Sequence, residues 1–180
     1  YAARTVLGNG TSTNPGNATI APGAAATSSD AFTFKTSTST DTVTAVTVGL
    51  AANTTSGINK VEITSEDGSI VYGSSTDPTA DSFSITLNQS TLTATTATTT
   101  YKIRITPKSH LSMPAPPGVE YAVTSTITSF SSANASSGTD GTSGTITIDN
   151  ASPGGVTATS TTPGQGQIDL GWTNPGGDFE

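Results

Sequence analysis

Few side chains in this sequence could take part in covalent catalysis, because it contains one histidine and no cysteine. The histidine, His110, lies between Ser109 and Leu111, and serine is so frequent that a hydroxyl group near it is expected by chance. A Ser-His-Asp triad also needs a carboxylate aligned with the imidazole. Zinc needs three or four nitrogen, sulfur or carboxylate ligands, which a single imidazole without cysteine does not supply. We therefore expect neither a serine hydrolase nor a zinc centre.

Paired carboxylates that hydrolyse glycosides would have to come from thirteen acidic residues, of which Glu62, Glu66 and Asp67 lie closest together in the sequence. Glu62 alternates with apolar neighbours, so we expect it to face solvent. Glu66 and Asp67 precede a glycine, a pattern typical of a hairpin turn. The sequence thus predicts that the protein is not an enzyme and needs no cofactor.

Calcium is the one metal that the sequence leaves as a hypothesis. Its ligands are oxygen atoms, which Asp, Asn and backbone carbonyl groups supply. Asp149 and Asn150 are the candidates, because they follow directly after the last expected strand of the main domain. No Asp-x-Asp-x-Asp loop accompanies them.

The composition indicates a surface rich in hydroxyl groups and poor in charge. Threonine and serine make up 62 of the 180 residues, charged residues make up 11%, and the formal net charge is −7. Six basic residues form no cationic stripe for phosphate groups, so we expect no nucleic-acid partner. The longest apolar run is far shorter than the ~20 residues of a membrane-spanning helix, so we expect no membrane insertion.

The elements that position these side chains are predicted to be strands. Threonine, valine and isoleucine are abundant, and their β-branched side chains favour the pleated sheet. Apolar and polar residues alternate repeatedly, and no window has the spacing and caps of an amphipathic helix. About eight short strands separated by turns predict an all-β fold, an antiparallel β-sandwich with extended terminal strands. The expected strands include residues 17–21, 32–34, 42–51, 61–63, 69–73, 83–87, 101–105, 118–127 and 145–148.

Two local irregularities are expected within these strands and turns. The apolar phase changes along residues 42–51, which predicts a β-bulge near Ala45. Asp67-Gly68 and Asp140-Gly141 carry residue types that favour tight turns, so we expect a turn at each.

The chain is expected to divide into three parts. Residues 12–150 fit one sandwich, and residues 1–11 form an N-terminal arm or the end of a preceding domain. The short apolar run that contains Val6 and Leu7 could pair with another chain. Residues 151–180 form a separate C-terminal segment.

The C-terminal part carries a resemblance to known families. Residues 148–153, Ile-Asp-Asn-Ala-Ser-Pro, resemble the junction between tandem immunoglobulin-like domains of large bacterial surface proteins. The following residues resemble the start of a fibronectin type III domain, with Trp172 at the position of the core tryptophan of its second strand. The preceding 140 residues resemble bacterial immunoglobulin-like repeats in a general way. The resemblance implies an immunoglobulin-like sandwich followed by two strands of a truncated second domain.

Such families serve as extracellular spacers, adhesion modules and fibre parts, which implies a location outside the cell or on its surface. We expect the partner to be another copy of the chain or a neighbouring domain, with assembly by strand addition through the termini. The expected assembly residues are Val6, Leu7, Ile168, Leu170 and Trp172. The alternative is a carbohydrate-binding module accompanying a secreted hydrolase, in which a glycan would contact aromatic rings at an edge. Only Tyr72 and Tyr101 are candidates for such rings.

Isopeptide bonds stabilise some immunoglobulin-like pilin domains, and they need a buried lysine beside Asn or Asp. The lysines of this chain alternate with apolar residues onto the solvent face or lie in loops. We therefore expect no isopeptide bond. An intact mass lower than the sequence mass by one water or one ammonia would contradict this expectation.

Overall fold

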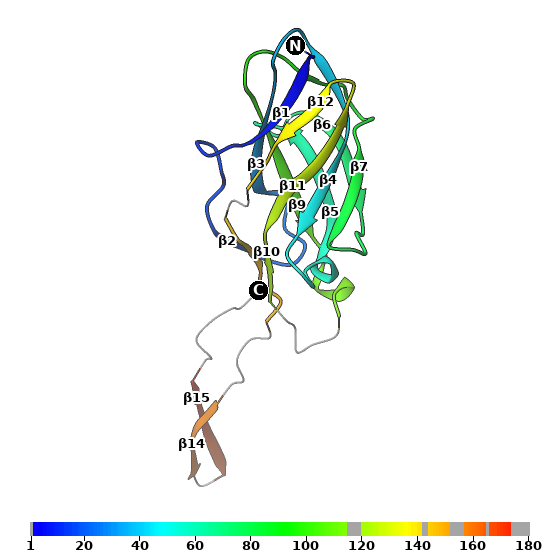
Figure 1. The fold of residues 1–180 in the computed structure, drawn as a ribbon. Helices are drawn as coiled ribbons and strands as arrows, with labels where there is room; N and C mark the ends of the chain where they lie inside the picture. The colour runs from blue at the N-terminus through cyan, green and yellow to red at the C-terminus, as the bar shows by residue number, and fades with distance from the viewer. Residues whose placement is uncertain (1, 115–119, 142–143, 152–156, 165, 174–180) are drawn as a thin grey trace.

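The computed structural model describes residues 2–114, 120–141, 144–151, 157–164 and 166–173. In this part of the chain the regular structure consists of strands and two 3-10 turns, η1 (Thr55–Gly57) and η2 (His110–Ser112). The strands pack as a β-sandwich, which confirms the predicted all-β class (Figure 1). Among the described segments, no helix has the length and apolar character needed to cross a membrane.

Six strands form the larger sheet, in the spatial order β12, β1, β3, β9, β5, β6. Neighbouring strands run antiparallel, except that β1 and β12 are parallel. The strand bounds are β1 (Arg4–Asn9), β3 (Thr27–Thr36), β5 (Ile58–Ser65), β6 (Val71–Thr76), β9 (Thr99–Pro107) and β12 (Ala135–Gly138).

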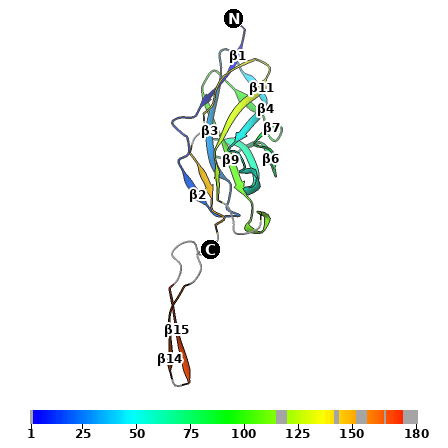
Figure 2. The same cartoon turned by 60° about the horizontal axis from the view of Figure 1, so that its bottom comes forward.

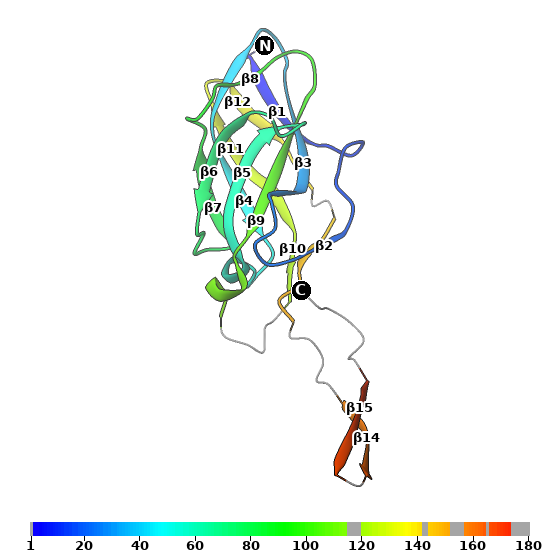
Figure 3. The ribbon, with the colours of Figure 1, turned by 180° about the vertical axis from the view of Figure 1, so that it is seen from behind.

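The second layer has β4 at its centre, paired with β11, β7 and β8. A three-stranded sheet of β10, β13 and β2 lies at one end of the sandwich (Figure 3). A hairpin of β14 and β15 forms a separate two-stranded sheet, drawn apart from the sandwich in Figure 2. The bounds are β2 (Ala18–Ile20), β4 (Asp41–Leu50), β7 (Ser82–Thr86), β8 (Leu92–Ala94), β10 (Tyr121–Val123), β11 (Ser125–Ser132), β13 (Ile146–Ile148), β14 (Thr157–Gly164) and β15 (Gln167–Thr173).

The core lies between the two layers and is organised around aromatic rings. Phe34 of β3 and Phe130 of β11 come from opposite layers, and their ring centroids are 4.9 Å apart. Phe32 stacks on Tyr101 within the larger sheet at 5.8 Å. Each fully buried aromatic side chain stabilises the fold by about 1.5–3 kcal/mol relative to exposure. The other buried core residues are mainly Ile and Val, so the contact of Phe34 with Phe130 is the aromatic one between the layers in the described part of the chain.

The β-bulge predicted near Ala45 is confirmed by the register of β4 and β11. Ser131 and Ser132 are consecutive in β11, but they lie opposite Ala45 and Val43. Thr44 is therefore the extra residue of β4. The bulge reconciles the two apolar phases, so that residues on both sides of it can face the same core.

The predicted turn at Asp67-Gly68 is also confirmed. Gly68 has a φ of +75°, a conformation that costs glycine little. Asp67 Oδ1 accepts hydrogen bonds from the Ser69 N–H at 3.1 Å and from the Ser65 hydroxyl at 2.6 Å. The Asp67 carboxylate thus stabilises the turn that joins β5 to β6.

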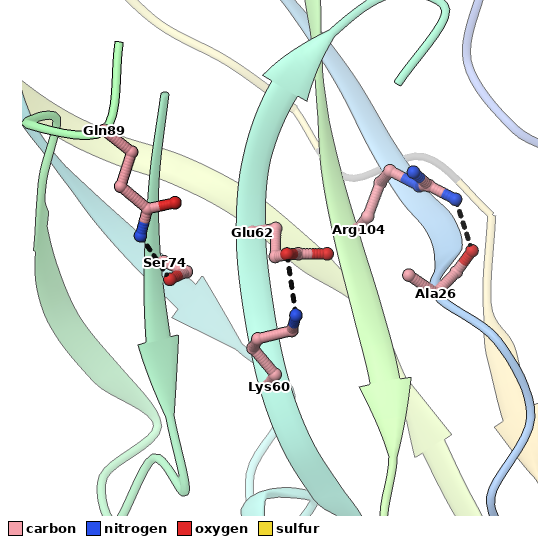
Figure 4. A network of polar contacts seen from close by, with 6 residues as sticks. All are labelled: Ala26, Lys60, Glu62, Ser74, Gln89 and Arg104. Carbon is pink, nitrogen blue, oxygen red and sulfur yellow. Dashed lines mark hydrogen bonds and ion pairs between the residues drawn. The ribbon is translucent and has the colours of Figure 1, made fainter. Parts of the chain in front are cut away.

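The prediction that Glu62 faces solvent is wrong, because only 9% of this residue is exposed. It lies in β5 opposite Arg104 of β9 and Ser74 of β6 (Figure 4). Its carboxylate is 2.8 Å from Lys60 Nζ, whereas the Arg104 guanidinium donates to the Ala26 carbonyl oxygen at 2.6 Å. Alternation along one strand did not reveal this burial, because it depends on Lys60 and on the strands β6 and β9 that flank Glu62 in the sheet.

The described part of the chain contains fifteen strands, more than the eight or so expected. Arg4–Asn9, expected as an arm or as the end of a preceding domain, pairs along its length with β3. The division into residues 1–11, 12–150 and 151–180 stays a prediction.

Candidate functional site

The strand β1 lies between β3 and β12 in the larger sheet. It pairs antiparallel with β3 from Thr5 to Asn9 and parallel with β12 from Arg4 to Leu7. Alternate side chains point inward, so that Thr5 is fully buried and Leu7 is 3% exposed. Because both of its long edges are paired, β1 links an early segment of the chain to a late one.

A cluster of polar groups holds β1 at its inner face. Asp41, at the start of β4, accepts a hydrogen bond from the Thr5 hydroxyl at 2.5 Å. The same carboxylate accepts the backbone N–H groups of Ala133 and Asn134, each at 3.2 Å. Asn134 Nδ2 in turn donates to Thr5 Oγ1 at 3.3 Å. This Thr5–Asp41–Asn134 cluster joins β1, β4 and the turn between β11 and β12.

The ionisation of Asp41 follows from these contacts. Burial raises the pKa of its carboxyl, but hydrogen bonds from Thr5, Ser132 and the N–H groups of Asn134 and Ala133 outweigh burial. The pKa of Asp41 therefore lies below its ordinary value of 3.8. At neutral pH the cluster contains a carboxylate that can only accept hydrogen bonds.

A second parallel pair joins β2 to β13. Ile146, Thr147 and Ile148 of β13 lie opposite residues 18–20 of β2, and both isoleucines are buried. The Asp149 N–H extends the pairing by donating to the Ile20 carbonyl oxygen at 3.0 Å. The late strand β13 is thus tied to an early strand, as β12 is tied to β1.

The two parallel pairs lie toward opposite ends of the sandwich. In Figure 1 β1 begins near the end marked N, and β2 and β10, which flank β13, lie near the other end. The view from behind gives the same arrangement (Figure 3). A load applied before β1 and after β13 would therefore act along the length of both pairs.

The predicted assembly residues lie in different surroundings. Leu7 belongs to the core, and Val6 is partly buried on the other face of β1. Trp172 in β15 is 63% exposed, whereas the side chains of Ile168 and Leu170 lie outside the described residues. The structure thus does not bring the five together, and their role in assembly stays a prediction.

The side chains of the two calcium candidates make local hydrogen bonds. Asp149 Oδ1 accepts the Ala151 N–H at 3.0 Å, and Asn150 Oδ1 lies 2.6 Å from His110 Nδ1. Within the described ranges, no three acidic or histidine side chains gather into a metal-binding group. Calcium at Asp149 and Asn150 stays a prediction.

The two tyrosines suggested for glycan contact line a shallow hollow of about 410 Å³ with the 65–67 turn and Thr99–Thr100. Tyr101 is only 3% exposed, so its suggested place as an edge platform is wrong. Burial, with a smaller effect of Tyr72, raises the pKa of Tyr101 to about 12. Tyr72 is the partly exposed ring, and it meets Tyr101 edge-on at 5.6 Å.

A carboxyl pair that sequence analysis missed joins Asp30 of β3 to Asp140, which follows β12. The turn predicted at Asp140-Gly141 runs into residues outside those described and stays a prediction. Asp30 is fully buried, and its side chain is hydrogen-bonded to Asp140, which requires a proton on one of them. Asp140 Oδ2 also accepts the Ile127 N–H at 2.8 Å. Burial raises the pKa of Asp140 above its ordinary value, despite the hydrogen bonds that favour the carboxylate.

This raised pKa gives a testable pH dependence. The folded state holds the proton more tightly than the unfolded state, so the pair stabilises the fold at acidic pH and loses that contribution as pH rises. We expect Asp140→Asn to be more stable than the unmodified chain at pH 7 and to have a flatter pH profile. Urea unfolding at pH 4 and pH 7 measures both effects.

Asp67→Asn is a control of opposite sign. Hydrogen bonds from Ser65 and Ser69 lower the pKa of the Asp67 carboxyl to about 2, so its contribution is present above 3.8 and is lost as pH falls toward 2. The variant should therefore be less stable at neutral pH. An Asp140→Asn protein that loses stability equally at both pH values would contradict the shared-proton interpretation.

Sequence comparison adds no family to these observations. Neither protein-family models nor curated proteins give a match to this chain.

Proposed function

We propose that this chain is a structural, load-bearing module of an extracellular bacterial surface protein. The observation that carries the proposal is the pair of parallel ladders, β1 with β12 and β2 with β13. They connect early and late strands of the same sandwich at its two ends. The hydroxyl-rich, weakly charged composition supports a structural role, because hydroxyl groups keep the surface of the module hydrated.

The geometry favours mechanical resistance for a simple physical reason. When tension pulls a strand along its own axis, all hydrogen bonds of the ladder are loaded together. When tension pulls a strand sideways from one end, the bonds break one after another. Tension transmitted through the chain before β1 and after β13 loads both parallel pairs in the first way.

Single-molecule pulling tests the proposal directly. The chain contains no cysteine, so introduced cysteines would be unique attachment points. We expect a higher unfolding force for handles at Ala2→Cys and Ala151→Cys than for handles at Ser56→Cys and Thr79→Cys. The second pair of exposed sites peels the edge strand β6 from β5.

Equal forces in the two pulling directions would count against a load-bearing role. Thermal unfolding of both double variants provides the control, since matched stabilities assign any difference in force to direction. Assembly by strand addition through β1 would require this strand to leave its place between β3 and β12. Such exchange between copies stays a prediction, which electron microscopy of the purified protein would test.

Glycan binding is a second candidate function, favoured by the hollow beside Tyr72. A partly exposed aromatic ring and the acidic side chains of Glu66 and Asp67 border the same 410 Å³ space. An aromatic face and carboxylate oxygens are groups that can contact the CH and hydroxyl groups of a sugar. Titration with oligosaccharides, monitored at the resonances of Tyr72, tests this candidate.

A further inference from the structure

The Thr5–Asp41–Asn134 cluster contains the groups needed to form a covalent bond. Thr5 supplies a hydroxyl, Asp41 a carboxylate that accepts its hydrogen at 2.5 Å, and Asn134 a carboxamide whose nitrogen is 3.3 Å from the same Oγ1. In nucleophilic catalysis, a hydroxyl group is hydrogen-bonded to a base and lies next to the carbonyl carbon that it attacks. Here all three groups belong to one chain and are held by three different elements.

We propose that Thr5 Oγ1 and Asn134 Cγ become joined by an intramolecular ester bond. Asp41 removes the hydroxyl proton as Oγ1 attacks Cγ, and a tetrahedral intermediate forms. The proton then passes to the amide nitrogen, the C–N bond breaks, and ammonia leaves. One hydroxyl and one carboxamide are thus converted into one ester and one ammonia, with no oxidant, reductant or other reactant.

The reactive arrangement differs from the observed one in how the Asn134 carboxamide is turned and in the approach of Thr5 Oγ1 to Cγ. The amide carbon is one covalent bond from the nitrogen that contacts Oγ1, and the terminal torsion of asparagine has a broad energy minimum. Rotation about this torsion turns the face of the carboxamide toward the hydroxyl. Two backbone N–H groups, those of Ala133 and Asn134, hold Asp41 in place during this rotation.

Burial favours the bond once it has formed. Thr5 is fully buried and Asp41 is 6% exposed, so water has little access from the side of the hydroxyl and its base, whereas the partly exposed Asn134 lets the ammonia leave. Intramolecular partners held in place reach effective molarities of about 10⁵–10⁸ M, which offsets the low reactivity of an amide. The reaction happens once per molecule, so a slow rate is sufficient.

The bond deepens the proposed load-bearing function, on which its biological meaning rests. It would join β1 covalently to the turn that precedes β12, at the end of the sandwich where tension enters. The chain between Thr5 and Asn134 could then not extend under load. No lysine takes part. A linkage that forms with loss of ammonia and that mild alkali hydrolyses belongs to the ester, because an isopeptide amide resists mild alkali, and it leaves the expectation of no isopeptide bond standing.

Mass spectrometry of the full chain tests the bond without any measurement of force. We expect an intact mass lower than the sequence mass by one ammonia. Trypsin cuts after Arg4, Lys35 and Lys108, so the peptides 5–35 and 109–180 should be recovered as one linked species. Mild alkali should hydrolyse the ester and separate them. An intact mass equal to the sequence mass would overturn the proposal.

Substitutions distinguish the ester from other losses of ammonia. Thr5→Ser keeps a hydroxyl and should keep the linked peptides, whereas Thr5→Val should abolish them. Asn134→Ala, in a partly exposed turn, removes the acyl group and serves as a second variant if Thr5→Val does not fold. A loss of ammonia that persists in Thr5→Val would show that an asparagine has cyclised onto its own backbone, and would refute the ester. If the protein resists force but its intact mass shows no loss of ammonia, the ester bond is refuted and the load-bearing function is not.

Discussion

Phe34→Ala is expected to lower the free energy of unfolding by about 3–5 kcal/mol. Phe34 is completely buried and meets the ring of Phe32 at 5.5 Å, that of Tyr101 at 5.9 Å and that of Phe130 at 4.9 Å. Truncation would leave a cavity between the two layers, which rigid backbone ladders on both sides cannot close. Urea unfolding monitored by far-UV circular dichroism measures the loss.

Leu111→Ala is the matched control for this substitution. Leu111 is 95% exposed, so its truncation should change the unfolding free energy by less than about 0.5 kcal/mol. Similar losses in the two variants would mean that the aromatic cluster does not hold the layers together. A loss below about 1 kcal/mol for Phe34→Ala would have the same meaning.

The strands of the core were predictable because their signal is local. Phe83 and Ile85 alternate with serine, and the structure places both in β7. The phase change that predicted the bulge in β4 is likewise contained in ten residues. In such segments the pleat alone dictates which side chains share a face, so no knowledge of the partner strand is needed.

The candidate site was not predictable, because its parts lie far apart in the sequence. Thr5 and Asn134 are separated by 129 positions, and threonine is too common to distinguish one buried hydroxyl from the others. The strand β12, Ala-Ser-Ser-Gly, has no apolar alternation and becomes a strand through its pairing with β1. The pairing of Asp30 with Asp140 was missed for the same reason.

Gly138→Ala is expected to disrupt the pairing of β1 with β12. Gly138 has a φ of +85°, where a side chain costs about 1–3 kcal/mol. A Cβ atom at this position would also overlap the carbonyl oxygen of Leu7, which lies directly opposite in the parallel ladder. Because the obstacle is backbone, relief requires one strand to move. We expect a loss of stability of about 3 kcal/mol or more and a lower unfolding force with handles at residues 2 and 151.

Gly23→Ala separates the two causes of this loss. Gly23 has a similar φ of +75°, but a Cβ atom there would meet only Ser109 Cα at 3.9 Å, an ordinary contact. It should therefore lose only about 1–2 kcal/mol, the cost of the left-handed backbone. The unfolding force along β1 should not change, because Gly23 lies outside both parallel pairs. If both variants lowered the force equally, the resistance would come from general stability, and the parallel ladder at β1 would not be the element that bears the load.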